Sequence, residues 1–236
     1  MRRRVSLAVL ILVSAYVTLL AFPQPLFAYR AQAGNLRLYS DAPFDVAAGE
    51  QALRLANAKL AKSPLYRGKP ASAFVCNTTW RRKLLFSYQD GAGGVAIPVI
   101  TSNVFLRAAR IGENRLLGPS GNVVPGVRTL DYYIAHEVGH LITGEHLGLW
   151  RYHRLPQWVR EGYADYVGKG GAFDYGEARA AMLDDARELD WRRSGLYTRF
   201  HLFCAHLLER RGWTVERFLT EAPAMEQVEA WVRAER

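Results

Sequence analysis

Cysteine is scarce in this sequence: only Cys76 and Cys204 occur among 236 residues. At most one disulfide can form, and an exported compartment would permit it. Cys204 lies in an apolar run with helical periodicity, where a buried free thiol behaves as a small hydrophobic group. The sequence therefore leaves two states open, a bridge between the two cysteines or a pair of free thiols.

Acidic residues are outnumbered by basic ones: 22 Asp and Glu stand against 31 Lys and Arg, and the formal net charge is +9. The arginines are scattered rather than gathered in one block, and the chain contains no nucleic-acid-binding module, internal repeat or low-complexity tract. We therefore expect no nucleic-acid partner. Dispersed positive charge is typical of solvated helix faces, and it also favours anionic surfaces such as phospholipid headgroups.

The N-terminus has the pattern of an export segment. Arginines at positions 2–4 precede an apolar run from Val5 to Phe22. This run reaches the length that spans a bilayer, so residues 1–33 are either a cleaved signal ending near the small residues Ala31 to Ala33 or a retained membrane anchor. Either alternative places residues 34–236 on the periplasmic or extracellular side, because the arginines stay inside.

Hydrophobic residues make up half of the chain, which is enough to bury the core of a single catalytic domain. Apolar and β-branched patterns predict strands in the first half and helices in the second. The predicted strands are 36–39, 71–76, 83–88 and 95–101, and the predicted helices are 49–61, one beginning after Thr129, 156–167, 176–189 and 196–211. This order indicates an α+β fold with a small sheet-containing N-terminal lobe and a mostly helical C-terminal lobe.

The most informative motif is the pentapeptide HEVGH at residues 136–140. Residues four apart lie on one face of a helix, so His136 and His140 can direct both imidazoles at one ion. Glu137 projects beside that ion as a general base for a metal-activated water. A catalytic zinc needs three protein ligands, and Glu161 on the next predicted helix can complete the set. The structural alternative is a pair of core histidines with Glu137 as a solvated neighbour.

Together with the segment from Pro156 to Tyr166, this motif resembles the gluzincin zinc metallopeptidases, the thermolysin-like class. The resemblance implies a zincin-like fold with one Zn²⁺ per chain between the two lobes, held by His136, His140 and Glu161. It also implies that Asp165 holds a ligand histidine through its other ring nitrogen. The implied reaction is hydrolysis of peptide bonds.

Other residues compete for roles at this site. His146 stands where the metzincin pattern has its third histidine, but that pattern requires glycine at the position of Thr143, so Glu161 is the favoured ligand. Peptide hydrolysis also needs a donor for the oxyanion. Tyr197 is the first candidate for this role, and His201, one helical turn later, is the second.

A peptide or protein substrate is the expected partner. Such a substrate would pair with an edge strand, for which residues 95–101 are the candidate, although Pro98 removes one donor. No individual substrate-binding residue is identified. Gly162 is expected to let the helices of the two motifs approach closely.

The favoured interpretation is an exported zinc metallopeptidase with Glu137 as its general base. One alternative is a membrane-tethered binding or assembly factor that retains the scaffold without turnover, and the intact Glu137 argues against it. Another is a zinc hydrolase that acts on a non-peptide amide, such as one in a cell wall, because similar folds support different reactions.

Overall fold

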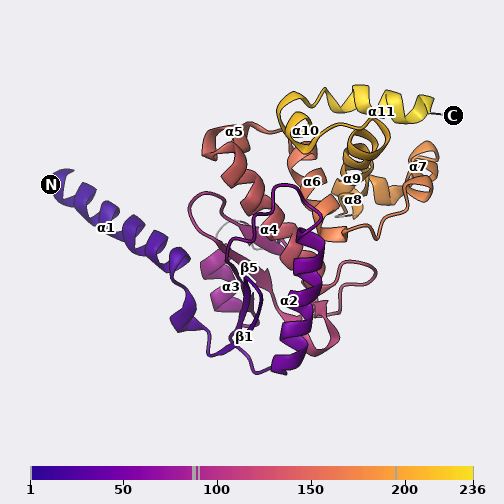
Figure 1. Cartoon of the computed structure of the whole chain (residues 1–236). Helices are drawn as coiled ribbons and strands as arrows, with labels where there is room; N and C mark the ends of the chain where they lie inside the picture. The colour runs from indigo at the N-terminus through magenta and orange to yellow at the C-terminus, as the bar shows by residue number, and fades with distance from the viewer. Residues whose placement is uncertain (1, 87–88, 90, 195, 236) are drawn as a thin grey trace.

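A mixed sheet occupies the first half of the chain, as seen in a computed structural model that describes residues 2–86, 89, 91–194 and 196–235 (Figure 1). The central strands β2, β3 and β5 are parallel, and the edge strands β1 and β4 run antiparallel to their neighbours. In spatial order the five strands are β1(Tyr29–Ala33), β2(Leu36–Ser40), β3(Ala71–Cys76), β5(Asn103–Arg107) and β4(Gly94–Ala96). A separate two-stranded pair consists of β6(Ala109–Arg110) and β7(Arg115–Leu116).

Helices dominate the chain after residue 129, and the last of them lie together on one side of the molecule, away from the sheet (Figure 1). The α-helices are α1(Arg2–Ala21), α2(Val46–Leu60), α3(Thr79–Phe86), α4(Leu130–Leu147), α5(Leu149–Arg154), α6(Gln157–Lys169), α7(Tyr175–Leu183), α8(Trp191–Ser194), α9(Thr198–Ala205), α10(Val215–Glu221) and α11(Met225–Ala234). A π-helical stretch, His206–Arg210, continues α9, and short 3₁₀ turns lie at Gln24–Leu26, Ile111–Glu113 and Arg187–Leu189. The predicted α+β class, with a sheet in the N-terminal part and a helical C-terminal part, is confirmed.

The central strand β3 is buried on both faces of the sheet. In β3, Ala73 and Val75 belong to the larger hydrophobic cluster, which includes side chains of α2 and α4. Phe74 and Cys76 belong to a second cluster, which includes side chains from the end of α1 and from α3. Successive side chains of a strand point to opposite faces, so α2 and α4 cover one face while α3 and the end of α1 cover the other.

Two predicted strands differ from the structure. The chain at 83–86 lies in α3 rather than in a strand, and residues 87 and 88 of that prediction lie outside the described part of the chain. The predicted strand 95–101 is reduced to β4, because Pro98 has no N–H to donate and the chain turns at 98–100. The position beside β3 belongs to β5, which the sequence analysis missed.

The end of α1 is attached to the folded domain, whereas its N-terminal part projects away from it (Figure 1). The Tyr16 hydroxyl donates to the Leu84 carbonyl oxygen at 2.9 Å, and Asn103 Nδ2 donates to the Leu20 carbonyl oxygen at 2.8 Å. The side chains from Val9 to Val13 are each more than half exposed. Within the described part of the chain, no helix is long and apolar enough to cross a membrane.

Strand β1 comes from the segment that the sequence analysis assigned to the export signal or anchor. All five of its residues pair with β2. Ala31, one of the small residues of the expected cleavage pattern, is buried. In this structure residues 29–33 are therefore part of the sheet.

Both cysteines are buried free thiols. Cys76 belongs to the second hydrophobic cluster and Cys204 to the larger one. Burial raises the pKa of both thiols, which keeps them protonated. Of the two states that the sequence allowed, a disulfide or two free thiols, the structure shows two free thiols.

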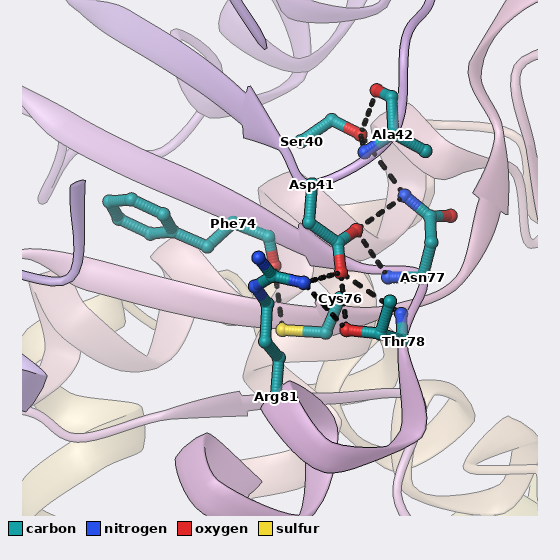
Figure 2. A network of polar contacts seen from close by, with 8 residues as sticks. All are labelled: Ser40, Asp41, Ala42, Phe74, Cys76, Asn77, Thr78 and Arg81. Carbon is teal, nitrogen blue, oxygen red and sulfur yellow. Dashed lines mark hydrogen bonds and ion pairs between the residues drawn. The ribbon is translucent and has the colours of Figure 1, made fainter. Parts of the chain in front are cut away.

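Asp41 joins the end of β2 to the start of α3 (Figure 2). Its carboxylate accepts hydrogen bonds from the backbone N–H groups of Asn77 at 2.8 Å and Thr78 at 3.0 Å, and from the Thr78 hydroxyl at 2.7 Å. Arg81 Nη1 lies 3.3 Å from the same carboxylate. The first N–H groups of a helix have no partner within the helix. Asp41 supplies acceptors for the N–H groups of the two residues that precede α3, and so ties the start of this helix to the end of β2.

Asp41→Ala is expected to lower the free energy of unfolding by about 3 kcal/mol, because it leaves Arg81 and the backbone at the start of α3 without their acceptor. Burial raises the pKa of Asp41, but hydrogen bonds from Thr78 and Asn77 outweigh burial and lower the pKa overall. A carboxyl with a lowered pKa in the folded state stabilises the fold above its unfolded pKa of about 3.9, and this contribution is lost as the pH falls.

Denaturant unfolding of the wild type, Asp41→Ala and Glu113→Ala at about pH 7 and about pH 3 measures this effect. Glu113 is an exposed acid paired with Arg110, so its removal should cost less than about 0.5 kcal/mol. The difference between the wild type and Asp41→Ala should shrink at the lower pH. Equal unfolding midpoints for the two variants at about pH 7 would contradict the role of Asp41.

Candidate metal centre

Helix α4 carries the HEVGH motif through the core of the molecule, and its residues 130–144 are buried. Its first turn is fixed by an ion pair between Asp131 and Lys59 of α2, with Oδ2 and Nζ 2.6 Å apart. Thr129 precedes the helix as predicted, but its side chain bonds to Asp131 rather than to the helix backbone. These contacts tie the start of α4 to α2.

Helix α6 packs against α4 and supplies the third candidate ligand. The helix predicted at 156–167 extends further than expected, because it continues to Lys169 and ends at Gly170, whose φ of 56° is left-handed. Gly168 lies inside the helix. A Cβ atom at Gly168 would lie 3.0 Å from the Tyr132 ring and 3.1 Å from His136 Cβ, so glycine allows α4 and α6 to pack this closely.

Gly162 has a different neighbour from the one expected. It faces α9 rather than α4, and a Cβ atom there would lie 2.6 Å from the carbonyl oxygen of Phe200. A backbone carbonyl group cannot move away from such a close contact as the end of a flexible side chain can. Gly162 therefore sets the close approach of α6 to α9.

His136, His140 and Glu161 bring three donor atoms together. Nε2 of His136 lies 3.6 Å from Oε2 of Glu161, and Nε2 of His140 lies 3.5 Å from the same oxygen. Ligand atoms about 2.0–2.2 Å from a tetrahedral zinc lie about 3.4 Å from one another, so this spacing fits the ion. Within the described part of the chain, this is the one group of His, Cys, Asp or Glu side chains that could hold a metal ion.

Opposite charges compensate for the burial of this triad. Burial raises the pKa of Glu161, but the imidazoles of His140 and His136 outweigh burial and lower it overall. Burial lowers the pKa of His136, but Glu161 and Glu137 outweigh burial and raise it. Glu161 is therefore ionised, which is the form that binds a metal.

Glu137 is buried beside the triad and faces the edge strand β4. A Cβ atom at Gly94 would lie 2.6 Å from Oε1 of Glu137, so a larger residue would displace the carboxylate. The Ala96 backbone N–H donates a hydrogen bond to Glu137. Burial raises the pKa of Glu137, although His136 and His140 oppose the shift. A raised pKa suits a carboxylate that takes up and returns a proton near neutral pH.

Tyrosine hydroxyls contact the second ring nitrogen of both histidines. The Tyr132 hydroxyl lies 3.4 Å from Nδ1 of His136, and the Tyr152 hydroxyl lies 3.1 Å from Nδ1 of His140. The resemblance implied a direct contact of Asp165 with a ligand histidine. In the structure Tyr132 stands between Asp165 and His136, and donates to Asp165 at 2.5 Å.

Neither the two tyrosines nor Gly94 was predicted from the sequence as part of the site. Tyr132 precedes His136 by one helical turn, and this spacing could have indicated a contact. Gly94 ends a glycine-rich turn just before a β-branched run, which is a weak signal of close backbone approach. For Tyr152 we find no signal in the sequence.

The two candidates for the oxyanion donor have different surroundings. Tyr197 lines the cleft, and its ring stacks nearly parallel to the His136 imidazole with centroids 6.1 Å apart. Burial raises the pKa of Tyr197, so its hydroxyl keeps its proton and can donate a hydrogen bond. His201 is buried behind α6, with Nδ1 2.9 Å from Oδ2 of Asp165. Of the two, Tyr197 is the one with access to the cleft.

An open cleft of about 780 Å³ reaches the triad. Its lining includes β4, the buried face of α4, Tyr152 and His153 of α5, and Arg160 and Glu161 of α6. Strand β4 pairs with β5 on one side, and no described strand pairs with its other side. The edge strand expected near the substrate therefore borders the cleft, although it spans only Gly94–Ala96.

His146 does not join the triad. Its Nε2 contacts the Glu216 carboxylate of α10 at the surface, so the structure gives the metzincin ligand set no support. His153 lines the cleft but is exposed.

Comparisons with known proteins add no family assignment. No protein-family model matches the chain. No curated protein matches it either. A metal site is thus supported by the HEVGH motif and by the geometry of the residues around it.

Proposed function

We propose that this protein is a zinc metallopeptidase of the gluzincin type, with one Zn²⁺ per chain bound by His136, His140 and Glu161. The observation that carries this proposal is the meeting of three donor atoms at the wall of an open cleft, with Glu137 beside them. Two imidazoles and one carboxylate suit zinc and leave a fourth position for water. The corresponding fold would be zincin-like, with the metal between the sheet-containing lobe and the helical lobe.

The chain's own residues supply most of the proposed mechanism. When bound, zinc would act as a Lewis acid and lower the pKa of water at the site. Glu137 accepts a proton as the water oxygen adds to the peptide carbonyl carbon, and it returns that proton to the leaving nitrogen as the C–N bond breaks. Tyr197 donates a hydrogen bond to the oxyanion that forms in the first step. Gly94 and Ala96 hold the Glu137 carboxylate in place.

The proposed substrate is an extended peptide or protein segment. The free side of β4 offers backbone hydrogen-bonding groups beside the triad, so a peptide could add to the sheet as a further strand. Because β4 is three residues long, backbone pairing alone provides little affinity. Side chains that line the cleft would supply the rest of the binding affinity and the specificity for the substrate.

The proposed location is the outer side of a membrane, with association through the N-terminal segment. The arginines at positions 2–4 and the apolar run that follows support this proposal. The apolar side chains exposed from Val9 to Val13 support it as well, because a helix that is apolar all round is stable when buried in protein or lipid. The hydrogen bonds of Tyr16 and Asn103 would keep the folded domain attached to that helix.

Metal analysis and peptide hydrolysis by the full-length protein test the proposed function. We expect close to one zinc per chain and cleavage of a fluorogenic peptide library that stops with a chelator and returns with added zinc. A folded protein without zinc would return the histidines to a structural role. Zinc with cleavage of a cell-wall amide but of no peptide would favour the non-peptide hydrolase. Zinc without any turnover would favour a binding or assembly factor.

A further inference from the structure

Each candidate ligand histidine uses its two ring nitrogens in the same way. Nε2 of His136 and of His140 faces the Glu161 carboxylate. Nδ1 of each faces a tyrosine hydroxyl, which belongs to Tyr132 for His136 and to Tyr152 for His140. Both tyrosines are buried, and both come from outside the two motifs that indicated the metal site.

Behind Tyr132 lies a buried polar network centred on Asp165. Oδ1 of Asp165 accepts the Tyr132 hydroxyl at 2.5 Å. Oδ2 lies 2.9 Å from Nδ1 of His201 and 2.8 Å from Nζ of Lys169. Burial raises the pKa of Asp165, but His201 and Lys169 outweigh burial and lower it, so the carboxylate is ionised.

The ionised carboxylate fixes the direction of the hydrogen bonds. Asp165 can only accept, so the Tyr132 hydroxyl must use its proton on Asp165. The lone pairs of that hydroxyl then remain for Nδ1–H of His136. A proton on Nδ1 leaves the Nε2 lone pair of the neutral imidazole directed at the point where Glu161 and His140 meet.

We infer that Tyr132 is a positioning residue for the metal site, which transmits the orienting effect of Asp165 to His136 through its hydroxyl, and that Tyr152 orients His140 in a parallel but weaker way. This inference rests on the proposed function, because it assumes that the two histidines bind zinc. The hydroxyl of Tyr152 has no carboxylate partner among its described hydrogen bonds, so its direction is less firmly fixed. The effect of Tyr132 should therefore exceed that of Tyr152.

Zinc affinity of the full-length protein, measured by competition with a chromophoric chelator, tests this inference. Tyr132→Phe should weaken zinc binding by about 10- to 100-fold, as loss of a group that orients a metal ligand usually does. Tyr152→Phe should weaken it less. The matched control is Tyr163→Phe, which removes the hydroxyl of another buried tyrosine that bonds to Ser63 at 2.7 Å, and which should leave the affinity unchanged.

A double-mutant cycle separates positioning from general damage to the core. If Asp165 acts on His136 through Tyr132, Asp165→Asn should weaken zinc binding in the wild type and have a much smaller effect in the Tyr132→Phe background. If the two substitutions have additive effects on the free energy of zinc binding, Asp165 does not act through Tyr132, and the inference is overturned. Thermal unfolding of each metal-free variant shows whether the fold survives. If Tyr132→Phe does not fold, Tyr152→Phe tests the parallel role, and unchanged affinity in that variant would overturn it.

Failure of the inference and failure of the proposed function give different results. A wild type that binds zinc, loses it with Glu161→Ala and keeps full affinity in Tyr132→Phe would overturn the inference alone. A folded wild type that binds no zinc would overturn the proposed function and the inference together.

Discussion

Replacing Glu137 with glutamine should reduce kcat for peptide hydrolysis by at least about 10²- to 10⁴-fold, while zinc remains bound. Glutamine has nearly the same shape as glutamate, so it can keep its place against Gly94 and Ala96. It cannot accept the proton of the attacking water. Because Glu137 is not a member of the triad, the metal content should stay near that of the wild type.

Steady-state kinetics with a cleaved peptide, together with zinc analysis of the same samples, measures this effect. The control is Glu145→Gln, an acid on the same helix that is exposed and paired with Lys69, and it should behave like the wild type. A Glu137→Gln variant that is folded, zinc-loaded and fully active would exclude Glu137 as the base. If the variant lost turnover and still supported the biological role of the protein, a binding or assembly function would be favoured over catalysis.

Replacing Glu161 with alanine should weaken zinc binding by more than about 100-fold, which is beyond the usual effect of losing a group that only orients a ligand. The variant removes the oxygen that lies within 3.6 Å of both imidazole nitrogens. It leaves two ligands, fewer than the three that a catalytic zinc requires. Activity should fall along with the metal content.

His146→Ala is the matched control for this experiment, because His146 is the rival third ligand. Its partner in the structure is Glu216, so zinc affinity should not change. Zinc retained in Glu161→Ala and lost in His146→Ala would move the assignment to the metzincin ligand set. Zinc retained in both variants would show that neither residue is the third ligand.

The helical part of the fold was more predictable than the sheet. Helices such as α2 and α4 depend on local hydrogen bonds and on apolar residues at helical spacing, and both patterns can be read within one segment. Strand β5 was missed, although it is buried at every residue like β3, which was predicted, and neither strand shows an alternation of buried and exposed side chains. Residues 83–86 were predicted as a strand but lie in α3, whose start is held by Asp41, a residue 36 positions before Asn77 in the chain.

The candidate site also has features that the local sequence predicts and features that depend on distant residues. The sequence by itself determined that His136 and His140 share a helix face with Glu137 beside them, because the spacing within a helix is a local property. Only the tertiary structure decided that the Glu161 carboxylate reaches both imidazoles and that Tyr132 stands between Asp165 and His136. The physical reason is that contacts between separate helices depend on how closely they pack, and this distance is set by residues such as Gly168 that carry no chemical signal.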